Sequence, residues 1–284
     1  LPFIEAIRQF SNDIGKNNTL FIHLTLVPYM RASDEIKTKP TQHTVKELRG
    51  LGISPDILVC RSTSPLTLET REKLAAFCHV SPAAVFSTHD VPNIYHVPLM
   101  LQEQGLCDIL GLDCYSTGLL SEWRKMALHL DTLEQEIRIA MVGKYTGLSD
   151  AYLSVIKSLQ HAAMAVDRKL VIDWVEASHL EGDWDNAEEI AIAWQMLKGA
   201  DGILVPGGFG DRGIEGKILA ANYSRTNNIP YLGICLGLQI ATIEFCRNVL
   251  GLAGANSTEF DENVEHAAVV FMPEISKTHL GGTM

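Results

Sequence analysis

The sequence predicts an α/β fold of two domains, each a mostly parallel sheet with helices on both faces. Short apolar runs recur along the chain and alternate with segments of helical apolar spacing, a pattern typical of βαβ units. Two such series occur within 284 residues, which is enough length for two domains. We expect domains at 1–120 and 137–284, joined by an amphipathic linker helix at 121–136.

The first series contains the elements expected of an incomplete α/β sheet. Pro40 precedes one of its helices as a start signal, and Thr41 or Thr44 could cap that helix. The expected strands are 19–27, 56–60 and 84–86, and the expected helices are 1–14, 41–51, 67–78 and 96–104.

The second series has the order of a doubly wound α/β domain. Its elements are a strand 137–142, a helix 150–166, a strand 170–175, a helix 187–197, a strand 202–205, a loop 206–216, a helix 217–226, a strand 229–232, a helix 239–250 and a strand-like run 267–272. In such folds the loops at the carboxyl ends of the strands carry the chemistry.

Composition and charge narrow the classes of protein to which this chain could belong. The 23 basic and 34 acidic residues give a net charge of -11, which argues against nonspecific binding to nucleic acid or membranes. No apolar run approaches the ~18 residues of a membrane span, and no signal segment is visible, so we expect a cytoplasmic protein. The six cysteines form no C-x-x-C pair, which argues against a zinc site and does not support a disulfide framework. The chain begins with Leu1 and stops soon after an apolar run, so we expect it to be a segment of something longer.

Cys235 lies in the pentapeptide Gly-Ile-Cys-Leu-Gly, between an apolar strand and a helix. Glycines at 233 and 237 relieve crowding in a sharp turn, and the following helix N-terminus favours a thiolate. The pattern predicts a nucleophile elbow. The alternative is a buried small hydrophobic residue.

Two further positions fit this interpretation. Gly208 lies in the loop 206–216, which follows the preceding strand. A backbone N–H at this glycine could approach an oxyanion, and the N–H of Leu236 would be the second donor. Gln239 lies one helical turn beyond Cys235 and could bind a small polar substrate.

A different segment, 37–42, combines two lysines, two threonines and a glutamine just before a helix. Ammonium groups and helix N-terminal N–H groups together can hold a phosphate. The alternative is an ordinary exposed loop.

These segments together resemble one family. Pro-Gly-Gly-Phe-Gly (206–210), Gly-Ile-Cys-Leu-Gly-Leu-Gln (233–239), Asn-Ser-Thr-Glu-Phe (256–260) and Lys-Thr-Lys-Pro-Thr-Gln (37–42) are similar to motifs of CTP synthase. The resemblance implies that 1–120 is the C-terminal part of a synthetase (amidoligase) domain. It implies that 137–284 is a class I glutamine amidotransferase domain, incomplete at its C-terminus.

The resemblance also implies roles for particular residues. Cys235 would form a glutamyl thioester and release ammonia, and Arg212 would lie in a loop near the activator GTP. The residues implied to hold glutamine are Gly208, Leu236, Gly237, Leu238, Gln239 and Glu259. Those implied to contact UTP or CTP are Lys37, Thr38, Lys39, Pro40, Thr41, Gln42 and Lys73, and those implied to contact ATP are His89, Asp90 and Val91.

Some parts of the family pattern are not found in the sequence. The family's P-loop and magnesium-binding carboxylates would precede residue 1, so Mg²⁺ and ATP are implied as cofactors without a metal ligand here. The family's His-Pro-Glu segment is also missing. His266 and His279 are the only histidines after the elbow, and neither precedes Pro-Glu, so we expect this chain alone to turn over little glutamine or UTP. Family members assemble as homotetramers and often as filaments.

Two other functions remain open. A stand-alone γ-glutamyl hydrolase would share the elbow, but it would have no use for the phosphate-binding segment at 37–42. A non-catalytic homologue with a role in assembly or regulation would be consistent with the missing base and P-loop.

Overall fold

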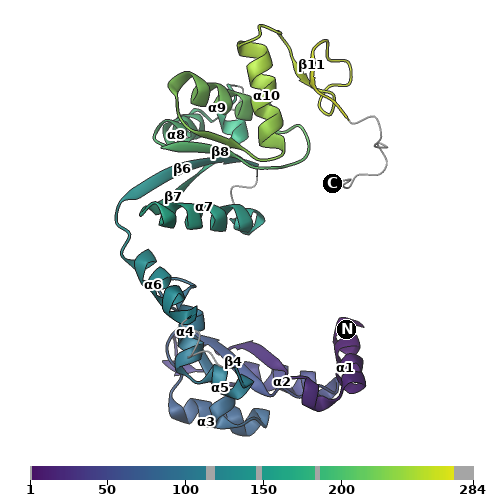
Figure 1. Ribbon diagram of the computed structural model, residues 1–284, viewed down its shortest axis with the longest axis vertical. Coiled ribbons are helices and arrows are strands. Elements are labelled where there is room, and N and C mark those ends of the chain that lie inside the picture. Colours follow the sequence, from purple (N-terminus) through teal and green to yellow (C-terminus); the bar gives the residue numbers. More distant parts are fainter. Residues whose placement is uncertain (1, 113–118, 145–148, 183–185, 272–284) are drawn as a thin grey trace. The chain divides into compact units, whose positions relative to one another are not determined.

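The computed structural model describes residues 2–112, 119–144, 149–182 and 186–271. The chain divides into two compact units, Leu1–Thr132 and Leu133–Met284, and each is described here by itself. Both units contain parallel strands with helices on the two faces of the sheet, so the predicted α/β fold is confirmed (Figure 1).

The sheet of the first unit has three parallel strands in the order β1-β4-β5. These are β1 (Ile22–Leu26), β4 (Ile57–Ser62) and β5 (Val85–His89). The strand expected at 19–27 is shorter because a 3-10 turn, η1 (Lys16–Asn18), precedes it. A small antiparallel hairpin of β2 (Tyr29–Met30) and β3 (Glu35–Ile36) follows β1, and the sequence did not indicate it.

Helices cover both faces of this sheet. Leu58 and Cys60 face α2 and α3, whereas Ile57 and Phe86 face α4 and α5, as the alternation of a strand requires. The helices are α1 (Pro2–Ile14), α2 (Lys39–Gly50), α3 (Leu68–Cys78), α4 (His96–Glu103), α5 (Leu106–Leu110) and α6 (Leu119–Asp131), and a 3-10 turn, η2 (Pro82–Ala84), precedes β5.

Helix α6 corresponds to the amphipathic segment expected at 121–135, but it begins and ends earlier. It packs on α4, where Trp123 donates a 2.6 Å hydrogen bond to the Tyr95 carbonyl. His96 and Asn93 bind Asp131 in its last turn, at 2.7 and 2.6 Å. The helix is therefore part of the first unit, and 132–135 connects it to the second. The domain limits 1–120, 121–136 and 137–284 stay a prediction.

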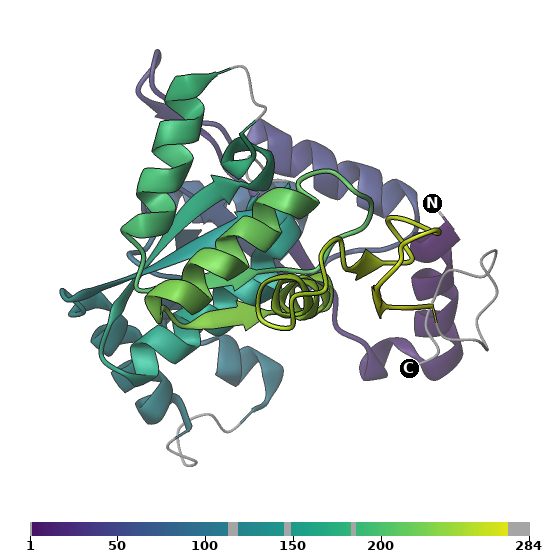
Figure 2. The ribbon, with the colours of Figure 1, turned by 90° about the horizontal axis from the view of Figure 1, so that it is seen from above.

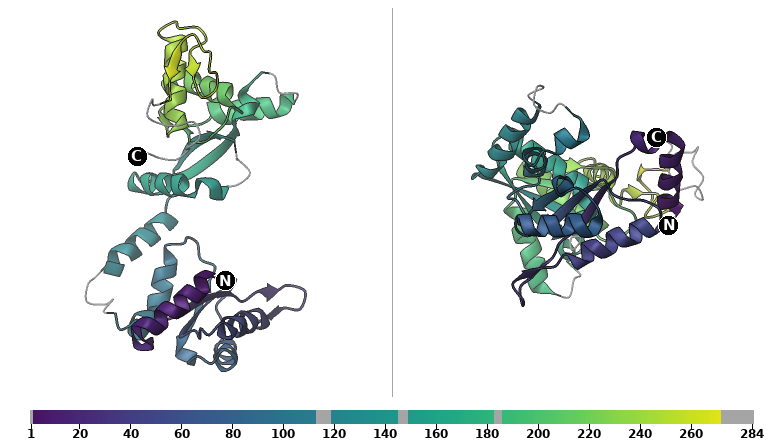
Figure 3. Two further views of the ribbon diagram at one scale, coloured as in Figure 1. Left: turned by 90° about the vertical axis from the view of Figure 1, so that its right-hand side faces the viewer. Right: turned by 90° about the horizontal axis from the view of Figure 1, so that it is seen from below.

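The sheet of the second unit has four parallel strands in the order β7-β6-β8-β9. They are β6 (Glu136–Gly143), β7 (Lys169–Glu176), β8 (Gly202–Val205) and β9 (Tyr231–Gly233). Helix α7 (Leu153–Ala165) covers one face of this sheet, and α8 (Ala187–Lys198) and α9 (Ile214–Asn227) cover the other (Figure 3). Met141 packs on the side of α7, and Ala140 packs on the side of α8 and α9.

The remaining elements complete the second unit. Helix α10 (Leu236–Asn248) follows β9 and packs on α9, and Figure 2 views it nearly along its axis. The others are the 3-10 turns η3 (Ser149–Tyr152) and η4 (Ala177–Leu180) and the paired short strands β10 (Asn256–Ser257) and β11 (Ala267–Val269).

The structure bears on two expectations from the sequence, one about membrane-spanning segments and one about the cysteines. None of the helices in the four described ranges has the length and apolar character needed to span a membrane. Cys107, at the buried start of α5, is disulfide-bonded. The expectation that the cysteines give no support for disulfides is therefore wrong at this position, because spacing alone does not reveal which thiols a fold brings together.

Candidate functional site

Cys235 is the N-cap residue of α10, separated from β9 by Ile234 alone, and it is exposed. Its backbone has φ 53° and ψ -106°, a conformation that non-glycine residues rarely adopt. Such a turn points the thiol away from both the strand and the helix. The geometry is the elbow that the sequence predicted.

The N–H groups beside the thiol differ in their hydrogen bonding. Gly237 N–H donates to Ile234 O at 3.0 Å, and the N–H groups of Leu238 and Gln239 donate to Cys235 O at 3.0 and 3.3 Å. Within the described ranges, the N–H of Leu236 has no acceptor. A helix leaves its first N–H groups without partners, so this one can receive a substrate oxyanion.

The loop after β8 lies against the elbow. A Cβ placed on Gly207 would be 3.4 Å from Cys235 Cβ, and one on Gly208 would be 3.7 Å from Leu236 Cδ2. The structure thus brings the loop and the thiol together, with Gly207 nearest to Cys235 and Gly208 nearest to Leu236. The N–H of Gly208 also has no acceptor in the part of the chain that the structure describes.

The first turn of α10 is seated directly on the sheet. A Cβ on Gly237 would lie 2.1 Å from the Val205 carbonyl oxygen, so no other residue fits without a backbone shift. Tyr231, on β9, donates a 2.8 Å hydrogen bond to the Gly237 carbonyl. Burial raises the pKa of Tyr231 above its usual range, which keeps this hydroxyl protonated as a donor.

Cations gather around the glycine-rich loop. Lys144 donates to the carbonyls of Phe209 and Gly210, and Arg212 donates to Lys144 O at 2.9 Å and to Glu176 at 2.8 Å. The sequence analysis named only Arg212 for this loop. Lys144 could have been noticed because it directly follows the strand expected at 137–142.

Lys217, in the first turn of α9, is a further cation that the sequence analysis missed. Its side chain is 2% exposed, and burial lowers its pKa to about 8, helped by the nearby charge of Lys144. Glu176 and Glu181 oppose this shift. A lysine directly after a glycine, at the start of the expected helix, gave no sequence signal of burial.

The other residues implied to hold glutamine differ in how far they are exposed to solvent. Gln239 is half-buried on the first turn of α10, and Leu238 is 64% exposed. Glu259 is exposed in the turn after β10, where its N–H donates to Ser257 Oγ at 3.2 Å.

His266 and His279 are the histidines after the elbow that could serve as a general base for Cys235. His266 is half-buried, and its carbonyl accepts the N–H of Asn256. No imidazole of the described residues hydrogen-bonds to Cys235 Sγ. His279 lies outside the described residues.

The lysine-rich segment of the first unit surrounds the start of α2. Lys37 lies beside β3 and forms an ion pair with Glu35, while Lys39 is exposed as the first residue of α2. The Lys37 hydrogen bond is the main reason that the pKa of Glu35 lies below its usual value, and the charge of Lys73 on α3 contributes. Lys37 therefore contacts this carboxylate directly, whereas Lys73 acts on it only through its charge.

The threonines of this segment have structural partners. Thr38, not Thr41 or Thr44, is the N-cap residue of α2, and its hydroxyl accepts from Gln42 Nε2 at 3.1 Å. Thr41 is fully buried and bonds Thr25 at 3.0 Å, so its hydroxyl faces the core. Pro40 occupies the first turn, where its missing N–H removes no helical bond.

His89, Asp90 and Val91 follow the carboxyl end of β5. His89 Nδ1 is buried without a hydrogen-bond partner, and so is the hydroxyl of neighbouring Thr88. Asp90 forms an ion pair with Arg61 at 3.5 Å, and Val91 is half-buried. Buried polar atoms without partners are uncommon and are consistent with a ligand site.

Across the described ranges, no three His, Cys, Asp or Glu side chains are grouped so that they could hold a metal ion. The residues described therefore do not fit a Mg²⁺ site.

The second unit is a doubly wound α/β unit with an exposed thiol at a strand-to-helix elbow and, among the described residues, two N–H groups without acceptors nearby. Such an arrangement belongs to the class of sites in which a cysteine can attack a carbonyl carbon. Comparison with known proteins narrows this class. Residues 1–113 match the family described as CTP synthase N-terminus, and residues 147–284 match glutamine amidotransferase class-I. Along its whole length the chain is related to CTP synthases at about half identity.

The relatives come from distant organisms. CTP synthase of Dictyostelium discoideum is 53% identical over 304 residues, and that of Methanocaldococcus jannaschii is 51% identical over 289 residues. Each alignment includes all of this chain and 53% of the relative, so the chain spans about half the length of the curated relatives it matches. Among solved structures, the glutaminase domain of Trypanosoma brucei CTPS with bound acivicin aligns at 46% identity and a TM-score of 0.45, covering 50% of this chain and 53% of that one.

Proposed function

We propose that this chain carries out part of the synthesis of CTP, in which glutamine hydrolysis at Cys235 supplies ammonia for the ATP-dependent amination of UTP. The observation that carries the proposal is the exposed thiol of Cys235 beside the open N–H groups of Leu236 and Gly208. The relatives named CTP synthase, which match along the whole chain, support the choice of reaction.

The chemistry at Cys235 is acyl transfer. The thiolate attacks the side-chain amide carbon of glutamine, and the oxyanion receives hydrogen bonds from Leu236 and Gly208. The C–N bond then breaks as the nitrogen takes up the proton that the thiol gave up, ammonia leaves and a thioester forms. Water hydrolyses the thioester to glutamate and restores the thiol. Gln239 and Glu259 would orient the amino-acid end of the substrate, with the Glu259 carboxylate on the ammonium group, and Gly237 and Leu238 would line the same site.

The first unit would bind the nucleotides. Lys37, Lys39 and Lys73 supply positive charge for the triphosphate of UTP, or of CTP as inhibitor, and the polar atoms at His89 suit a purine such as that of ATP. We further propose that 1–120 corresponds to the C-terminal part of an amidoligase domain and that GTP acts near Arg212. Mg²⁺ would accompany ATP. A cytoplasmic homo-oligomer is part of the same proposal.

The test is the substitution Cys235→Ala. The protein is treated with a glutamine analogue in which a chloromethyl ketone replaces the side-chain amide, and incorporation is measured by mass spectrometry. We expect labelling that glutamine suppresses in the wild-type protein and none in Cys235→Ala, with Cys246→Ala as the matched control because Cys246 lies on the same helix.

The second readout uses a full-length protein that contains this sequence. There, Cys235→Ala should abolish CTP formation from glutamine and leave formation from added ammonia largely intact. Labelling that glutamine does not suppress, or loss of both activities in a folded variant, would contradict the proposal.

A further inference from the structure

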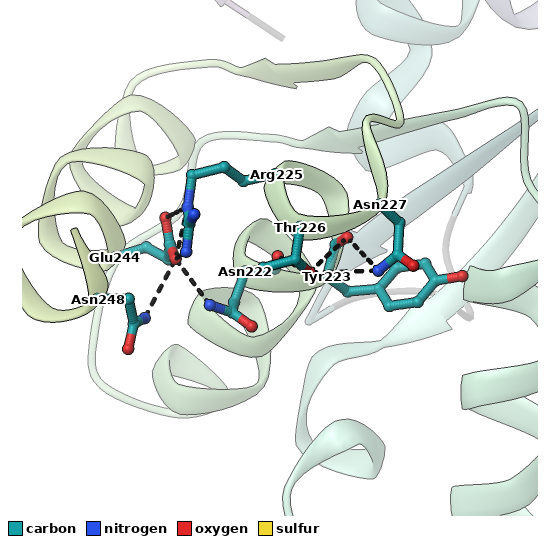
Figure 4. A network of polar contacts seen from close by, with 7 residues as sticks. All are labelled: Asn222, Tyr223, Arg225, Thr226, Asn227, Glu244 and Asn248. Carbon is teal, nitrogen blue, oxygen red and sulfur yellow. Dashed lines mark hydrogen bonds and ion pairs between the residues drawn. The ribbon is translucent and has the colours of Figure 1, made fainter.

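A polar network around a buried carboxylate joins α9 to α10 (Figure 4). Glu244, on α10, is 2% exposed and accepts from Arg225 Nε at 3.0 and 3.1 Å and from Arg225 Nη2 at 2.8 Å. Its Oε1 atom also accepts from Asn222 at 2.9 Å and from Asn248 at 3.1 Å. Both oxygens of this buried carboxylate therefore have partners.

The network is ionised. Burial alone would raise the pKa of Glu244, but the hydrogen bonds from Arg225, Asn222 and Asn248 outweigh it, and the pKa lies below its usual value. A charged, two-pronged contact between Arg225 and Glu244 has a fixed orientation as well as a fixed distance.

Stability alone does not account for a charged pair at this place. Apolar side chains already join the two helices, among them Ile218 of α9 and Ile240 and Ile243 of α10. Only the carboxylate of this pair is buried: the Arg225 side chain is 37% exposed, and ion pairs open to solvent contribute little to stability. Apolar contacts, however, permit small rotations and shifts of one helix on another, whereas the Arg225–Glu244 bonds do not.

The position of α10 matters because Cys235 is its N-cap. The positive φ of Cys235 is strained and persists only where the surroundings hold it. Gly237, two residues on, contacts the Val205 carbonyl without space for a Cβ. A small movement of α10 would therefore relax the elbow and carry the thiol away from the loop at Gly207 and Gly208.

We infer that Arg225 and Glu244 are positioning residues that hold the Cys235 thiol in its reactive orientation through α10. The inference rests on the proposed role of Cys235 as the nucleophile. It adds a residue pair that neither touches the substrate nor lies in the elbow.

The test uses the same chloromethyl ketone analogue of glutamine on the whole chain. The Cys235 thiolate attacks the CH₂ carbon, a C–S bond forms, the C–Cl bond breaks and chloride leaves. The time course at several concentrations gives the maximal rate of inactivation, kinact, and the half-saturating concentration, KI. Iodoacetamide, which has no amino-acid group, gives the rate for an unoriented reagent.

For Glu244→Gln and Arg225→Lys we expect kinact to fall roughly tenfold, because misplacement of a reacting group lowers the rate steeply. KI should stay within about twofold, because the residues that contact the analogue are unchanged. The rate with iodoacetamide should change little, since the thiol stays exposed.

The double variant Arg225→Met/Glu244→Leu separates positioning from stability. This apolar pair should keep the wild-type Tm or raise it, yet kinact should stay low. If kinact recovers together with Tm, the pair is only structural and the inference is wrong. The same conclusion follows if the single variants have wild-type kinact.

Asp173→Asn is the matched control. Asp173 accepts two bonds from Arg138, at 3.1 and 2.9 Å, and so forms a similar pair in the same unit but between β6 and β7. The kinact of the Asp173→Asn variant should equal that of the wild type. If the wild-type protein itself reacts no faster with the glutamine analogue than with chloroacetone, the proposed function fails, an outcome distinct from failure of the positioning role.

Discussion

At the scale of single residues, Lys217 gives a prediction about pH. Its folded-state pKa of about 8 lies below the ordinary 10.5, so between these values the unfolded chain binds more protons than the folded one. The free energy of unfolding should therefore rise with pH across this window as far as Lys217 contributes. Below about pH 8 the buried charge costs stability in full.

Lys217→Met should remove this cost. We expect the variant to be more stable than wild type by about 2–3 kcal/mol at pH 7, and the difference to shrink as the pH approaches 10.5. Urea unfolding of both proteins at pH 7 and pH 10 measures this difference in the free energy of unfolding. An equal difference at the two pH values would mean that Lys217 is charged or neutral throughout.

Lys37 and Lys39 give a prediction about binding. Replacing both by alanine should weaken the affinity for UTP and CTP, because each charged phosphate contact contributes ~1.5–3 kcal/mol. Calorimetry measures the affinity, and Lys46→Ala, an exposed change on the same helix, serves as control. Unchanged affinity would restore the alternative of an ordinary exposed loop. Labelling of Cys235 should be the same in all three proteins.

Residues differ in how far sequence could place them. The elbow at Cys235 was predictable because a turn that tight requires glycine at fixed positions, and these are visible as a pattern. The pairing of Lys144 with the loop carbonyls at Phe209 and Gly210 was not, since it joins positions 65 and 66 residues apart. Glu244 was missed for a different reason: a charged residue in a helix usually faces solvent, and only the fold buries it.

At the scale of elements, long periodic segments were predictable and very short ones were not. The parallel strands and their crossover helices follow from apolar runs and spacing. The hairpin of β2 and β3 has strands of two residues, too short to show an alternation. Helix α10 begins at Leu236 rather than at 239, because its first turn contains the glycine of the elbow, which is a poor helix former.

The contact between α9 and η4 gives a prediction at this scale. A Cβ on Gly216 would lie 1.8 Å from the Ala177 carbonyl oxygen, so Gly216→Ala should force the backbones apart and destabilise the protein by about 2–4 kcal/mol. Gly50 is the control: it also lies in a helix, but a Cβ there meets nothing within 4 Å. Gly50→Ala should stabilise the protein by ~0.5–1 kcal/mol. Thermal unfolding compares the two, and similar effects would contradict the steric argument.

At the scale of the whole molecule, the candidate thiol site draws all its residues from the second unit. The connection at 132–135 contains exposed Glu134, outside any helix or strand. A protease specific for glutamate should cut after Glu134 at low enzyme ratio, and Cys235 should keep its rate of labelling afterwards. Glu134→Gln should resist this cut. Loss of labelling on cleavage would show that the second unit does not hold the site alone.

The exposure of Cys235 also has a consequence for keeping the protein active in the laboratory. Among the described free thiols, Cys60 and Cys78 are buried and Cys246 is half-buried, and burial raises the pKa of Cys60 to about 12. Peroxide attacks accessible thiolates, so oxidation to sulfenic acid should begin at Cys235 and leave the fold intact. A preparation stored without reductant would then look unchanged by circular dichroism while its nucleophile is lost.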